Sequence, residues 1–525
     1  MNLFMFNKVV TAAEAAKKIS DGAFIGLNGV GGSGIPMELV DAIIDRYKED
    51  GHPKNLSLIH SGGNGGAFAL TSPEGLVGTY YGGFAGADPA VMDGDRIPSY
   101  SLTQGIATQL YRAQSMDMPY LSKAGLHTYV DPRQQGGAIN AKAKEKSIVE
   151  VLEIGGEEYL HFKIPPVTVA LIRATTADKD GNLVNEEESI KNEIYPLAAA
   201  AHNNGGIVIA QVKNLVEFGQ IDAADVKVPG MLVDYVVVCS DPVKYHPQGM
   251  GMTFQIGATG HARVDADSIP IETWAPKNER LVLARRGALE LWPGCISNVG
   301  MGAPDGIAYV AASEGLYDMF YSTNELGAVG GVTGGGFFFG GAFNAHAYMD
   351  HHLMFDFING HGLDITFLGA AEIDESGSVN VTRIAGRTNG SGGFVNISSS
   401  THKVVFLATL TAGAKMTVEN GALKILQEGK PLKFVPEVEQ IAFNGKEAVK
   451  KGQEVIYITE RAVFKLINGK VTLIEYAEGL DLEKDIIANM KFRPDIASDV
   501  KPIPAFCFAS GKIGLKEQWE RRLSS

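Results

Sequence analysis

Cysteine is scarce in this sequence. Cys239, Cys295 and Cys507 are the only three among 525 residues, they lie far apart, and none belongs to a CxxC pair. An odd number of widely spaced cysteines predicts neither a disulfide framework nor a thiolate metal site. We therefore expect a protein that folds in a reducing compartment.

Long apolar runs are also missing. No segment approaches the about 18 consecutive apolar residues that a membrane-spanning helix needs. The apolar start MNLFMF is short, has no basic flank ahead of it and is followed by the amphipathic AAEAAKKI, which is unlike a signal peptide. These features predict a cytoplasmic protein without a membrane partner.

Positive charge is in deficit. Lys and Arg number 46 against 60 Asp and Glu, which gives a formal net charge of −14 at pH 7. This sign opposes attraction to the phosphates of nucleic acids. We therefore expect no nucleic-acid partner.

Glycine, in contrast, is abundant. The sequence has 63 glycines, whereas an average usage of about 7% would give roughly 37. Dense clusters lie at 29–34, 62–66, 82–86, 327–341 and 386–393. Clustered glycines indicate loops that turn sharply or approach a ligand closely, so the pattern is typical of a binding protein.

The first half alternates between strand and helix patterns. Apolar β-rich runs at 23–28 and 56–62 flank a helix pattern over 36–50. Further strands are predicted at 167–175, 207–212 and 235–240, with a turn at 178–181 and a helix over about 185–203. This βαβ pattern predicts a mainly parallel sheet with crossover helices.

The pattern fades between 241 and 278 and then resumes. A helix is predicted over 279–291, a strand over 295–300 and a helix over 305–315. The tail from 402 predicts a strand, hairpins within 455–477 and a helix over 481–490. Segments 21–40 and 293–310 share a strand, an Asn, a glycine turn and a helix that begins at a proline, so either a duplicated fold or a chance likeness of two strand-turn-helix segments explains them.

Three local motifs have both a functional and a structural interpretation. The turn Gly300-Met301-Gly302 can hold a phosphate or a carbonyl oxygen, but its spacing is not GxGxxG, and no P-loop motif occurs. Glu325 has two interpretations: it places a functional carboxylate at the end of a predicted strand, beside the glycine-rich segment 327–341, or it is a solvated residue at a strand end. The histidines of AHAYMDHH have no established zinc spacing, so packing or surface roles are favoured, and we expect no metal.

Eight segments, taken together and in order, resemble the family I coenzyme A transferases, specifically the single-chain short-chain acyl-CoA type that acts with acetate and propionate. The first half carries DGAFIGLNGVGGSGIPMELV, SLTQGIATQLYRA and TVALIRATTADKDGNL. The second half carries ARRGALELWPGCISNVGMGAP, NELGAVGG, FDFINGHGLDITFLGAAEID, NGSGGF and ITERAVFKL.

This resemblance implies an α/β fold of two related open α/β domains with mainly parallel sheets and an active site at the domain interface. The N-terminal, alpha-subunit-like domain would cover 1–240, a linker region 241–278, and the C-terminal, beta-subunit-like domain 279–525. The second domain would carry the nucleophile. A homo-oligomer, either a dimer or a tetramer, is also implied.

The resemblance assigns roles to particular residues. Glu325 matches the family nucleophile, although relatives usually have Ser or Asn where this chain has Leu326, which bears on the choice of substrate. Gln104 matches the side-chain donor of an oxyanion hole, and Gly392, or next to it Gly393, matches the backbone donor. The CoA pocket would be lined by Gly300, Met301 and Gly302.

The implied reaction transfers coenzyme A reversibly from a short-chain acyl-CoA to a carboxylic acid. It would proceed by a ping-pong mechanism through an acyl-glutamyl anhydride and a glutamyl-CoA thioester, with CoA as a substrate and no permanently bound cofactor. An acyl-CoA hydrolase that uses the same glutamate is the alternative, and a CoA-responsive binding module without turnover is a third interpretation. The acyl group is not specified by the sequence.

Overall fold

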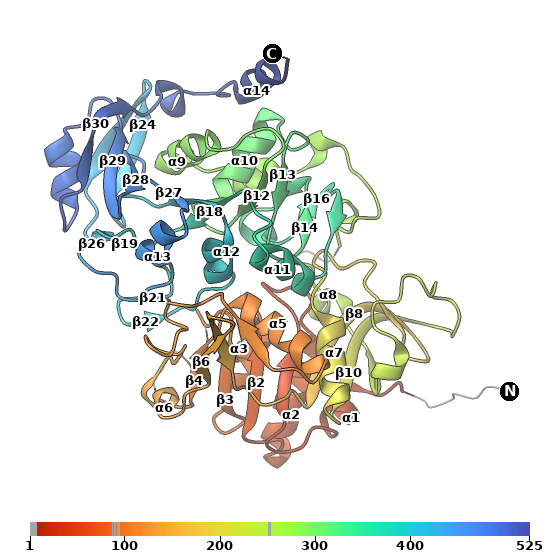
Figure 1. Ribbon diagram of the computed structural model, residues 1–525. Helices are drawn as coiled ribbons and strands as arrows, with labels where there is room; N and C mark the ends of the chain where they lie inside the picture. Colours follow the sequence, from red (N-terminus) through yellow and green to blue (C-terminus); the bar gives the residue numbers. More distant parts are fainter. Residues whose placement is uncertain (1–7, 87, 89–90, 92–94, 250–253, 525) are drawn as a thin grey trace. The chain divides into compact units, whose positions relative to one another are not determined.

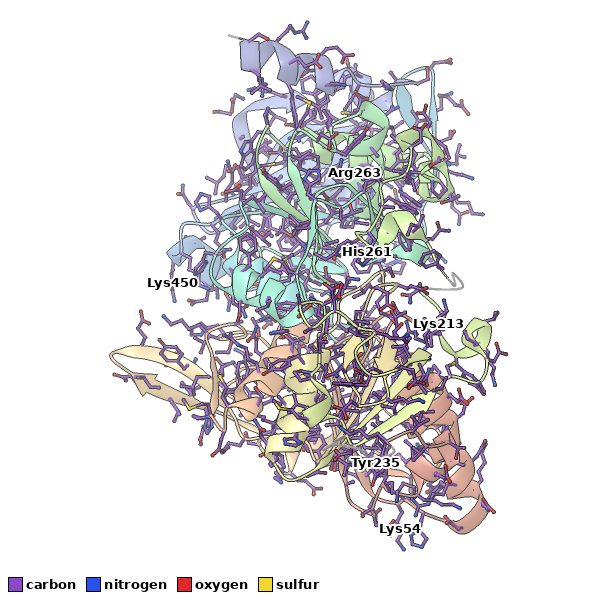
Figure 2. The ribbon with its side chains drawn as sticks, turned by 90° about the vertical axis from the view of Figure 1, so that its right-hand side faces the viewer. Lys54, Lys213, Tyr235, His261, Arg263 and Lys450 are labelled. Carbon is purple, nitrogen blue, oxygen red and sulfur yellow. The ribbon has the colours of Figure 1, made fainter. Side chains whose placement is uncertain are left out.

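A computed structural model describes residues 8–86, 88, 91, 95–249 and 254–524. The chain divides into two compact units. Unit 1 contains the described residues up to Ala262, Tyr348–Asp356 and Arg387–Asn396, and unit 2 contains the rest. His261 and Arg263, both labelled in Figure 2, flank the point where the chain first leaves unit 1.

The main sheet of unit 1 has the strand order β11-β10-β8-β1-β2-β3-β4, with β9 paired to β8. Neighbouring strands along this order run parallel. The chain adds strands on one side of β1 and then returns on its other side with β8, so a topological switch point lies between β1 and β8. The strands are β1 (Phe24–Leu27), β2 (Leu56–His60), β3 (Val77–Gly82), β4 (Ser99–Ser101), β8 (Val169–Asp178), β9 (Leu183–Val184), β10 (Ile207–Val216) and β11 (Tyr235–Val238).

Helices flank this sheet, as Figure 1 shows. All four residues of β1 are buried, which agrees with a parallel strand covered on both faces. Helix α2 buries Leu39, Val40 and Ile43 and ends at Gly51, whose φ of 76° is left-handed. The helices are α1 (Ala12–Ala16), α2 (Met37–Asp50), α3 (Gly65–Thr71), α5 (Gln104–Ser115), α6 (Ala141–Lys144), α7 (Ile194–Asn203) and α8 (Pro242–Tyr245), and a small sheet contains β5 (Tyr120–Ser122), β6 (Val149–Ile154) and β7 (Glu157–Phe162).

The main sheet of unit 2 is mixed. From β14 its order is β14-β13-β12-β18-β23-β27-β28-β29-β30. The strands from β13 to β27 are parallel, and β27, β28 and β29 form antiparallel hairpins. Its strands are β12 (Ile296–Val299), β13 (Tyr321–Thr323), β14 (Ala328–Val329), β18 (Ile365–Gly369), β23 (Lys403–Leu407), β27 (Glu454–Ile458), β28 (Ala462–Ile467), β29 (Lys470–Tyr476) and β30 (Asp495–Pro502).

One buried cluster forms a core of unit 2, and the C-terminal helix contributes to it. Trp519 is 1% exposed and meets Phe320 edge to face, with ring centroids 6.1 Å apart. The helices of this unit include α9 (Glu279–Ala288), α10 (Asp305–Glu314), α13 (Gly445–Lys450) and α14 (Leu515–Ser524). Helix α11 (His351–Asn359) and helix α12 (Phe394–Ser400) each contain residues of both units.

Short paired segments complete the described structure. They are β15 (Val332–Thr333), β16 (Ala342–Phe343), β17 (Ala347–Tyr348), β19 (Glu372–Asp374), β20 (Val379–Asn380), β21 (Arg383–Ile384), β22 (Arg387–Thr388), β24 (Lys415–Glu419), β25 (Ala422–Gln427) and β26 (Phe434–Val435).

The fold class is confirmed, and all three cysteines are free and buried. The predicted strands at 23–28, 56–62, 167–175, 207–212 and 235–240 correspond to β1, β2, β8, β10 and β11. The likeness between segments 21–40 and 293–310 has a structural counterpart. A proline is the N-cap of both α2 and α10, and each helix follows a strand and a glycine turn.

Two predicted helices were partly wrong. The helix expected over about 185–203 begins only at Ile194. In the preceding segment the Lys191 ammonium donates to the carbonyls of Asn185 and Glu188, both at 2.7 Å. Both carbonyls therefore accept from a side chain, and the Asn185 carbonyl also accepts from the Glu188 N–H at 3.3 Å, which closes a single turn and not an α-helix.

The helix expected over 481–490 is two short turns, the π-type η6 (Leu482–Ile486) and the 3₁₀-type η7 (Ile487–Asn489). Arg461 donates to the Asp485 carbonyl at 2.8 Å. The Asp485 carbonyl, in the middle of this segment, therefore accepts from a side chain, and the segment forms two short turns in place of one regular α-helix.

Candidate active site

In unit 2, Glu325 lies in the tight turn between β13 and β14. Leu326 N–H donates to the Asn324 side-chain oxygen at 3.0 Å, and Gly327 N–H donates to the Asn324 carbonyl at 3.2 Å. Gly327 has a φ of 109°, which favours glycine at this position. Glu325 is 7% exposed. The expected place, a carboxylate at the carboxyl end of a strand beside a glycine, is confirmed.

The turn Gly300-Met301-Gly302 lies at the same strand edge of unit 2. Strands β12 and β13 are parallel, with Asn298 level with Thr323. The turn follows the end of β12 and Glu325 follows the end of β13, so both lie at the edge formed by the carboxyl ends of these parallel strands.

The glycine at position 300 has a packing reason. Its N–H donates to the Phe367 carbonyl at 2.9 Å. A Cβ at this position would lie only 3.1 Å from the same oxygen and 3.1 Å from a Leu368 methyl. Gly302 has a φ of 93° and open space around it, and Met301 is 61% exposed. The turn therefore offers backbone groups and the exposed Met301 side chain at the carboxyl ends of these strands.

Asp305 begins α10 directly after this turn. Gly336 N–H donates to its carboxylate at 3.3 Å, and its own N–H donates to the Gly302 carbonyl at 3.2 Å. Burial raises the pKa of Asp305 to about 6. A carboxylate with a raised pKa beside a glycine turn is a functional-site feature, and the sequence analysis did not single it out.

In unit 1, Gln104 is the first residue of α5. Thr103 caps the helix by accepting from Ile106 N–H at 3.1 Å. The backbone N–H of Gln104, free of any helical partner at this position, donates to the Gly392 carbonyl at 2.9 Å. Gln104 is 3% exposed. The structure thus holds the predicted glutamine against the predicted glycine turn.

Gly392 and Gly393 precede α12. Gly392 has a φ of 54°, and its N–H donates to the Gly83 carbonyl at 2.9 Å. An oxyanion could use the N–H of Gly392 only by displacing that carbonyl. The carbonyl of Gly392, in contrast, anchors the backbone of Gln104.

His351 was missed by the sequence analysis as a functional residue. Its Nε2 lies 2.7 Å from the Gln104 side-chain nitrogen, and its Nδ1 lies 2.5 Å from a Glu193 carboxylate oxygen. Ser61 donates to the other oxygen of Glu193 at 2.6 Å. All of these residues belong to unit 1. The partners are 158 and 247 residues away in sequence, so no local motif could have revealed the network.

The histidines of the segment 346–352 have separate partners. His346 lies 3.3 Å from Asp318, whereas His351 faces Glu193 and Gln104. Within the described part of the chain, no group of three or more His, Cys, Asp or Glu side chains is arranged to hold a metal ion.

A second glycine turn, GVGGSG at 29–34, does have GxGxxG spacing between β1 and α2, and the sequence analysis did not weigh it. A dinucleotide site of this type also needs an acidic residue at the end of the next strand. Strand β2 ends at His60 instead, and Ser61 follows it. The motif therefore lacks the ribose-binding acid.

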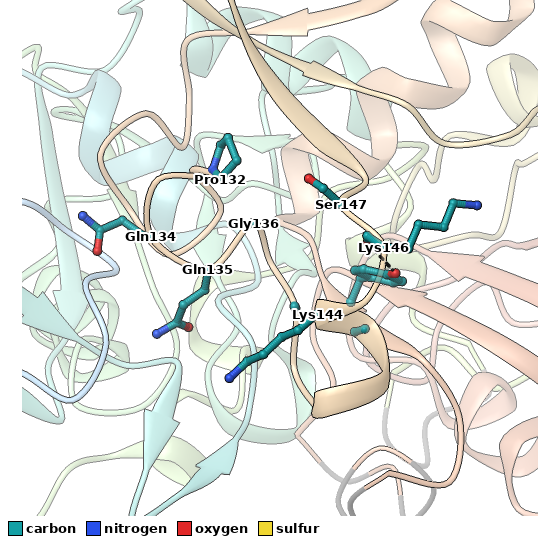
Figure 3. A pocket seen from close by; sticks show the side chains of 10 residues that line it. Pro132, Gln134, Gln135, Gly136, Lys144, Lys146 and Ser147 are labelled. Atoms are coloured by element: carbon teal, nitrogen blue, oxygen red, sulfur yellow. Dashed lines mark hydrogen bonds between the residues drawn. The ribbon is translucent and has the colours of Figure 1, made fainter.

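Two cavities lie away from the predicted site residues. One, of about 330 Å³, is lined by Gln134, Gln135, Lys144, Lys146 and neighbouring residues, as Figure 3 shows. The other, of about 690 Å³, lies in unit 1 at the carboxyl ends of β8 and β10. Lys191 and Tyr348 line this larger cavity. None of the predicted site residues lines either one.

Both units are open α/β folds with glycine turns after strands, and unit 2 also has a buried glutamate at a strand end, an arrangement that α/β enzymes use to bind their ligands. A family model described as "Coenzyme A transferase" matches residues 9–239. The chain belongs to this family, as a single-chain member of family I, and is a CoA-transferase. As such it moves coenzyme A between an acyl-CoA and a carboxylate, and CoA is a substrate.

Several relatives support this assignment. The chain is 40% identical to caffeate CoA-transferase of Acetobacterium woodii over 97% of this chain and 98% of the relative. It is 38% identical to acetate CoA-transferase YdiF of Escherichia coli K12 over 96% of each chain. One subunit of the 3-oxoadipate CoA-transferase of Acinetobacter baylyi is 28% identical over 45% of this chain and 97% of its own length.

The fold matches a solved structure of the same kind. The crystal structure of the YdiF apoenzyme from Escherichia coli O157:H7 has a TM-score of 0.89 at 38% identity, covering 96% of this chain and 97% of that one. A structure described as the YdiF thioester complex with CoA also has a TM-score of 0.89. Across the described residues, no helix is both long and apolar enough to cross a membrane.

Proposed function

We propose that this CoA-transferase moves CoA between short-chain acyl-CoA thioesters and short-chain carboxylic acids of the acetate and propionate type, with Glu325 as the nucleophile. The observation that carries the proposal is the buried Glu325 in the turn after β13, at the sheet edge where the Gly300-Met301-Gly302 turn follows β12. The acetate and caffeate CoA-transferases among the relatives support the reaction class. The YdiF thioester complex with CoA supports a covalent thioester as a chemical possibility.

The proposed chemistry needs four balanced steps. The Glu325 carboxylate attacks the thioester carbonyl, which forms an acyl-glutamyl anhydride and releases the CoA thiolate. The thiolate then attacks the glutamyl carbonyl, which forms a glutamyl-CoA thioester and releases the first acid as its carboxylate. The acceptor carboxylate repeats these two steps in reverse, which regenerates Glu325 and gives the new acyl-CoA.

Each attack creates a tetrahedral oxyanion, and we propose that Gln104 stabilises it with a side-chain N–H. Because the Gly392 N–H already donates to Gly83, we assign the backbone donor to Gly393 and an anchoring role to Gly392. One donor of this kind lowers the barrier by about 3–4 kcal/mol in comparable enzymes.

We further propose that Gly300, Met301 and Gly302 contact the CoA moiety. The exposed Met301 and the open space at Gly302 suit a long ligand that passes along the strand edge. A homo-oligomer, dimer or tetramer, and a cytoplasmic location stay predictions from the sequence.

Mass spectrometry tests the proposal directly. The enzyme is incubated with acetyl-CoA, propionyl-CoA or butyryl-CoA, and peptides are examined for a CoA adduct on Glu325. We expect an adduct that disappears when acetate or propionate is added, with formation of the corresponding new acyl-CoA. Glu325→Gln should form no adduct and transfer no CoA.

Asp318→Asn is the matched control, because Asp318 is an exposed carboxylate of the same unit. It should keep both the adduct and the transfer. Steady release of CoA without any added acid and without an adduct would contradict transfer and favour a hydrolase. An adduct on another residue would exclude Glu325 as the nucleophile.

A further inference from the structure

In unit 2, the carboxyl ends of four parallel strands form one continuous edge. Strands β13, β12, β18 and β23 are neighbours in that order and run parallel. Glu325 follows β13, the turn Gly300-Met301-Gly302 follows β12, and Thr409 lies two residues after the end of β23. A ligand attached at Glu325 can therefore run across the turn toward Thr409.

The glycine turn extends over the end of β18, which lies between β12 and β23. A Cβ at Gly369, the last residue of β18, would lie 4.0 Å from the Met301 carbonyl oxygen. Neighbouring strands are about 4.8 Å apart, so the three steps from β13 to β23 span about 14 Å. The extended pantetheine arm of CoA covers a distance of this order, so a thioester at Glu325 brings the CoA diphosphate to the edge beyond β18.

Lys433 supplies a positive charge at that end of the edge. Its ammonium donates to the Thr409 hydroxyl at 3.2 Å. Within the described residues it forms no ion pair with a carboxylate. Burial lowers the pKa of Lys433, the charge of Glu460 opposes this effect, and the positive charge of Arg280 lowers the pKa further.

Arg280 is a second positive charge beside the turn. It lies one helical turn before Ala284 in α9, on the same helix face. A Cβ on Gly306 would lie 2.6 Å from the Ala284 Cβ, so this face of α9 packs against the start of α10, next to the glycine turn. Figure 1 shows the two helices side by side.

The guanidinium of Arg280 is exposed, and in the described part of the chain no carboxylate pairs with it. Asp305 is a nearby acid: burial raises its pKa, and the charge of Arg280 opposes this. The Asp305 carboxylate, however, accepts from the Gly336 N–H at 3.3 Å. Two cations without a paired carboxylate at one strand edge repel each other and favour a bound polyanion.

We propose that Arg280 and Lys433 bind the 5′-diphosphate of CoA at this edge of the unit 2 sheet. The inference rests on the proposed function, in which Glu325 is the nucleophile and the Gly300-Met301-Gly302 turn contacts CoA. A guanidinium can donate to two phosphate oxygens at once, and an ammonium acts as a compact point charge. The two cations would hold the part of CoA that is remote from the reacting bond, where binding energy can be used to lower the barrier.

Substrates that differ in their phosphates test this assignment. Acetyl-CoA carries the diphosphate and a 3′-phosphate, acetyl-dephospho-CoA keeps only the diphosphate, and acetyl-pantetheine has no phosphate. For Arg280→Gln and for Lys433→Gln we expect kcat/KM to fall about 10-fold with the first two substrates and by no more than about twofold with acetyl-pantetheine. Arg280→Lys keeps the charge and should recover most of the loss.

Two results would overturn the assignment. A loss of equal size with acetyl-pantetheine would show that the variants change the structure of the edge and not a phosphate contact. A loss that is confined to acetyl-CoA would assign the two cations to the 3′-phosphate instead of the diphosphate.

Arg521→Gln is the matched control, because Arg521 is an exposed arginine of α14 in the same unit. It should leave all three values of kcat/KM unchanged. If Lys433→Gln does not fold, or acetyl-pantetheine reacts too slowly to measure, inhibition of Arg280→Gln by ADP decides, because ADP carries the diphosphate without the pantetheine arm. ADP should compete with acetyl-CoA, and its Ki should be about 10-fold higher for Arg280→Gln than for the unchanged enzyme. Equal Ki values would contradict the proposal.

The CoA adduct on Glu325 separates this proposal from the proposed function. If the unchanged enzyme forms no adduct with acetyl-CoA, propionyl-CoA or butyryl-CoA, the proposed function fails. If the adduct forms and is discharged by the acceptor acid, but Arg280→Gln affects all three acetyl substrates alike, only the phosphate assignment is wrong.

Discussion

At the scale of single residues, unit 1 contains a fully buried ion pair. Arg173 and Glu188 are almost fully buried and joined at 2.7 Å. His246 lies 2.9 Å from the other oxygen of Glu188, and Gln248 donates to Glu188 at 3.0 Å. Burial would raise the pKa of Glu188, but the charges of Arg173 and His246 dominate and hold it well below its ordinary value.

Glu188→Gln should therefore destabilise the protein strongly. Arg173 would keep its charge in a buried site without a counter-ion, which costs about 3–5 kcal/mol in comparable pairs. Thermal unfolding followed by circular dichroism should show a clearly lower midpoint. Glu217→Gln, which breaks the exposed pair with Lys179, should leave the midpoint nearly unchanged. Equal midpoints for the two variants would contradict the argument.

Individual site residues were predictable to different degrees. The position of Glu325 was singled out from a local signal, a predicted strand, a carboxylate and then glycines, but its role as nucleophile was assigned through the family resemblance. Gln104 was assigned only through the family resemblance. His351 and Glu193 gave no signal, because their partners are distant in sequence and become neighbours only when the segment 348–356 joins unit 1.

At the scale of secondary-structure elements, the sequence predicted best where apolar periodicity is strong. Buried strands such as β1 and β8 and the amphipathic α2 were located within a few residues. The prediction failed over 185–193, where side chains take over the bonding of the backbone. The pairing order of the strands and the mixed sheet of unit 2 could not be predicted, since they depend on contacts between distant segments.

The start of α10 gives a prediction about pH. The pKa of Asp305 is about 6, raised by burial from an ordinary value of 3.8. Between these two values the folded state binds more protons than the unfolded state, so stability falls as pH rises from about 4 to about 6. Each pKa unit is worth about 1.4 kcal/mol, and Asp305 is only partly buried. Asp305→Asn should therefore gain about 1–2 kcal/mol at pH 7 and nothing near pH 4.

Chemical denaturation at several pH values measures this difference. Asp499→Asn, which changes an exposed aspartate of β30, should reproduce the pH dependence of the unchanged protein. A gain for Asp305→Asn that is the same at pH 4 and pH 7 would show that the change acts through something other than titration of Asp305.

At the scale of the whole molecule, the chain contributes to unit 1 three times. The segments Tyr348–Asp356 and Arg387–Asn396 follow the first departure from unit 1 at Ala262. They bring His351 to Glu193 and Gly392 to Gln104 and Gly83. The 3-oxoadipate CoA-transferase, one subunit of which matches less than half of this chain, shows that a division into separate chains occurs within the family.

A split at Ala262 should therefore leave the first fragment incomplete. Residues 1–262 alone would contain the buried Glu193 without His351 and the Gln104 backbone without Gly392. We expect this fragment to bind a hydrophobic dye more strongly than the intact chain and to unfold at a lower urea concentration. Co-expression with residues 263–525 should restore the urea midpoint of the intact chain and the CoA-transferase activity.

The sign of the stability change caused by Glu193→Gln then distinguishes the loss of a specific contact from a general effect of truncation. In the isolated fragment the Glu193 carboxylate has lost its contact with His351, so Glu193→Gln should stabilise the fragment by removing an uncompensated charge. In the intact chain the same change removes one member of an existing pair and should not stabilise it. Urea unfolding of the four proteins measures both effects under one condition. If Glu193→Gln stabilises the intact chain, or leaves the stability of the fragment unchanged, then the loss of the contact between Glu193 and His351 does not explain the effect of cutting the chain.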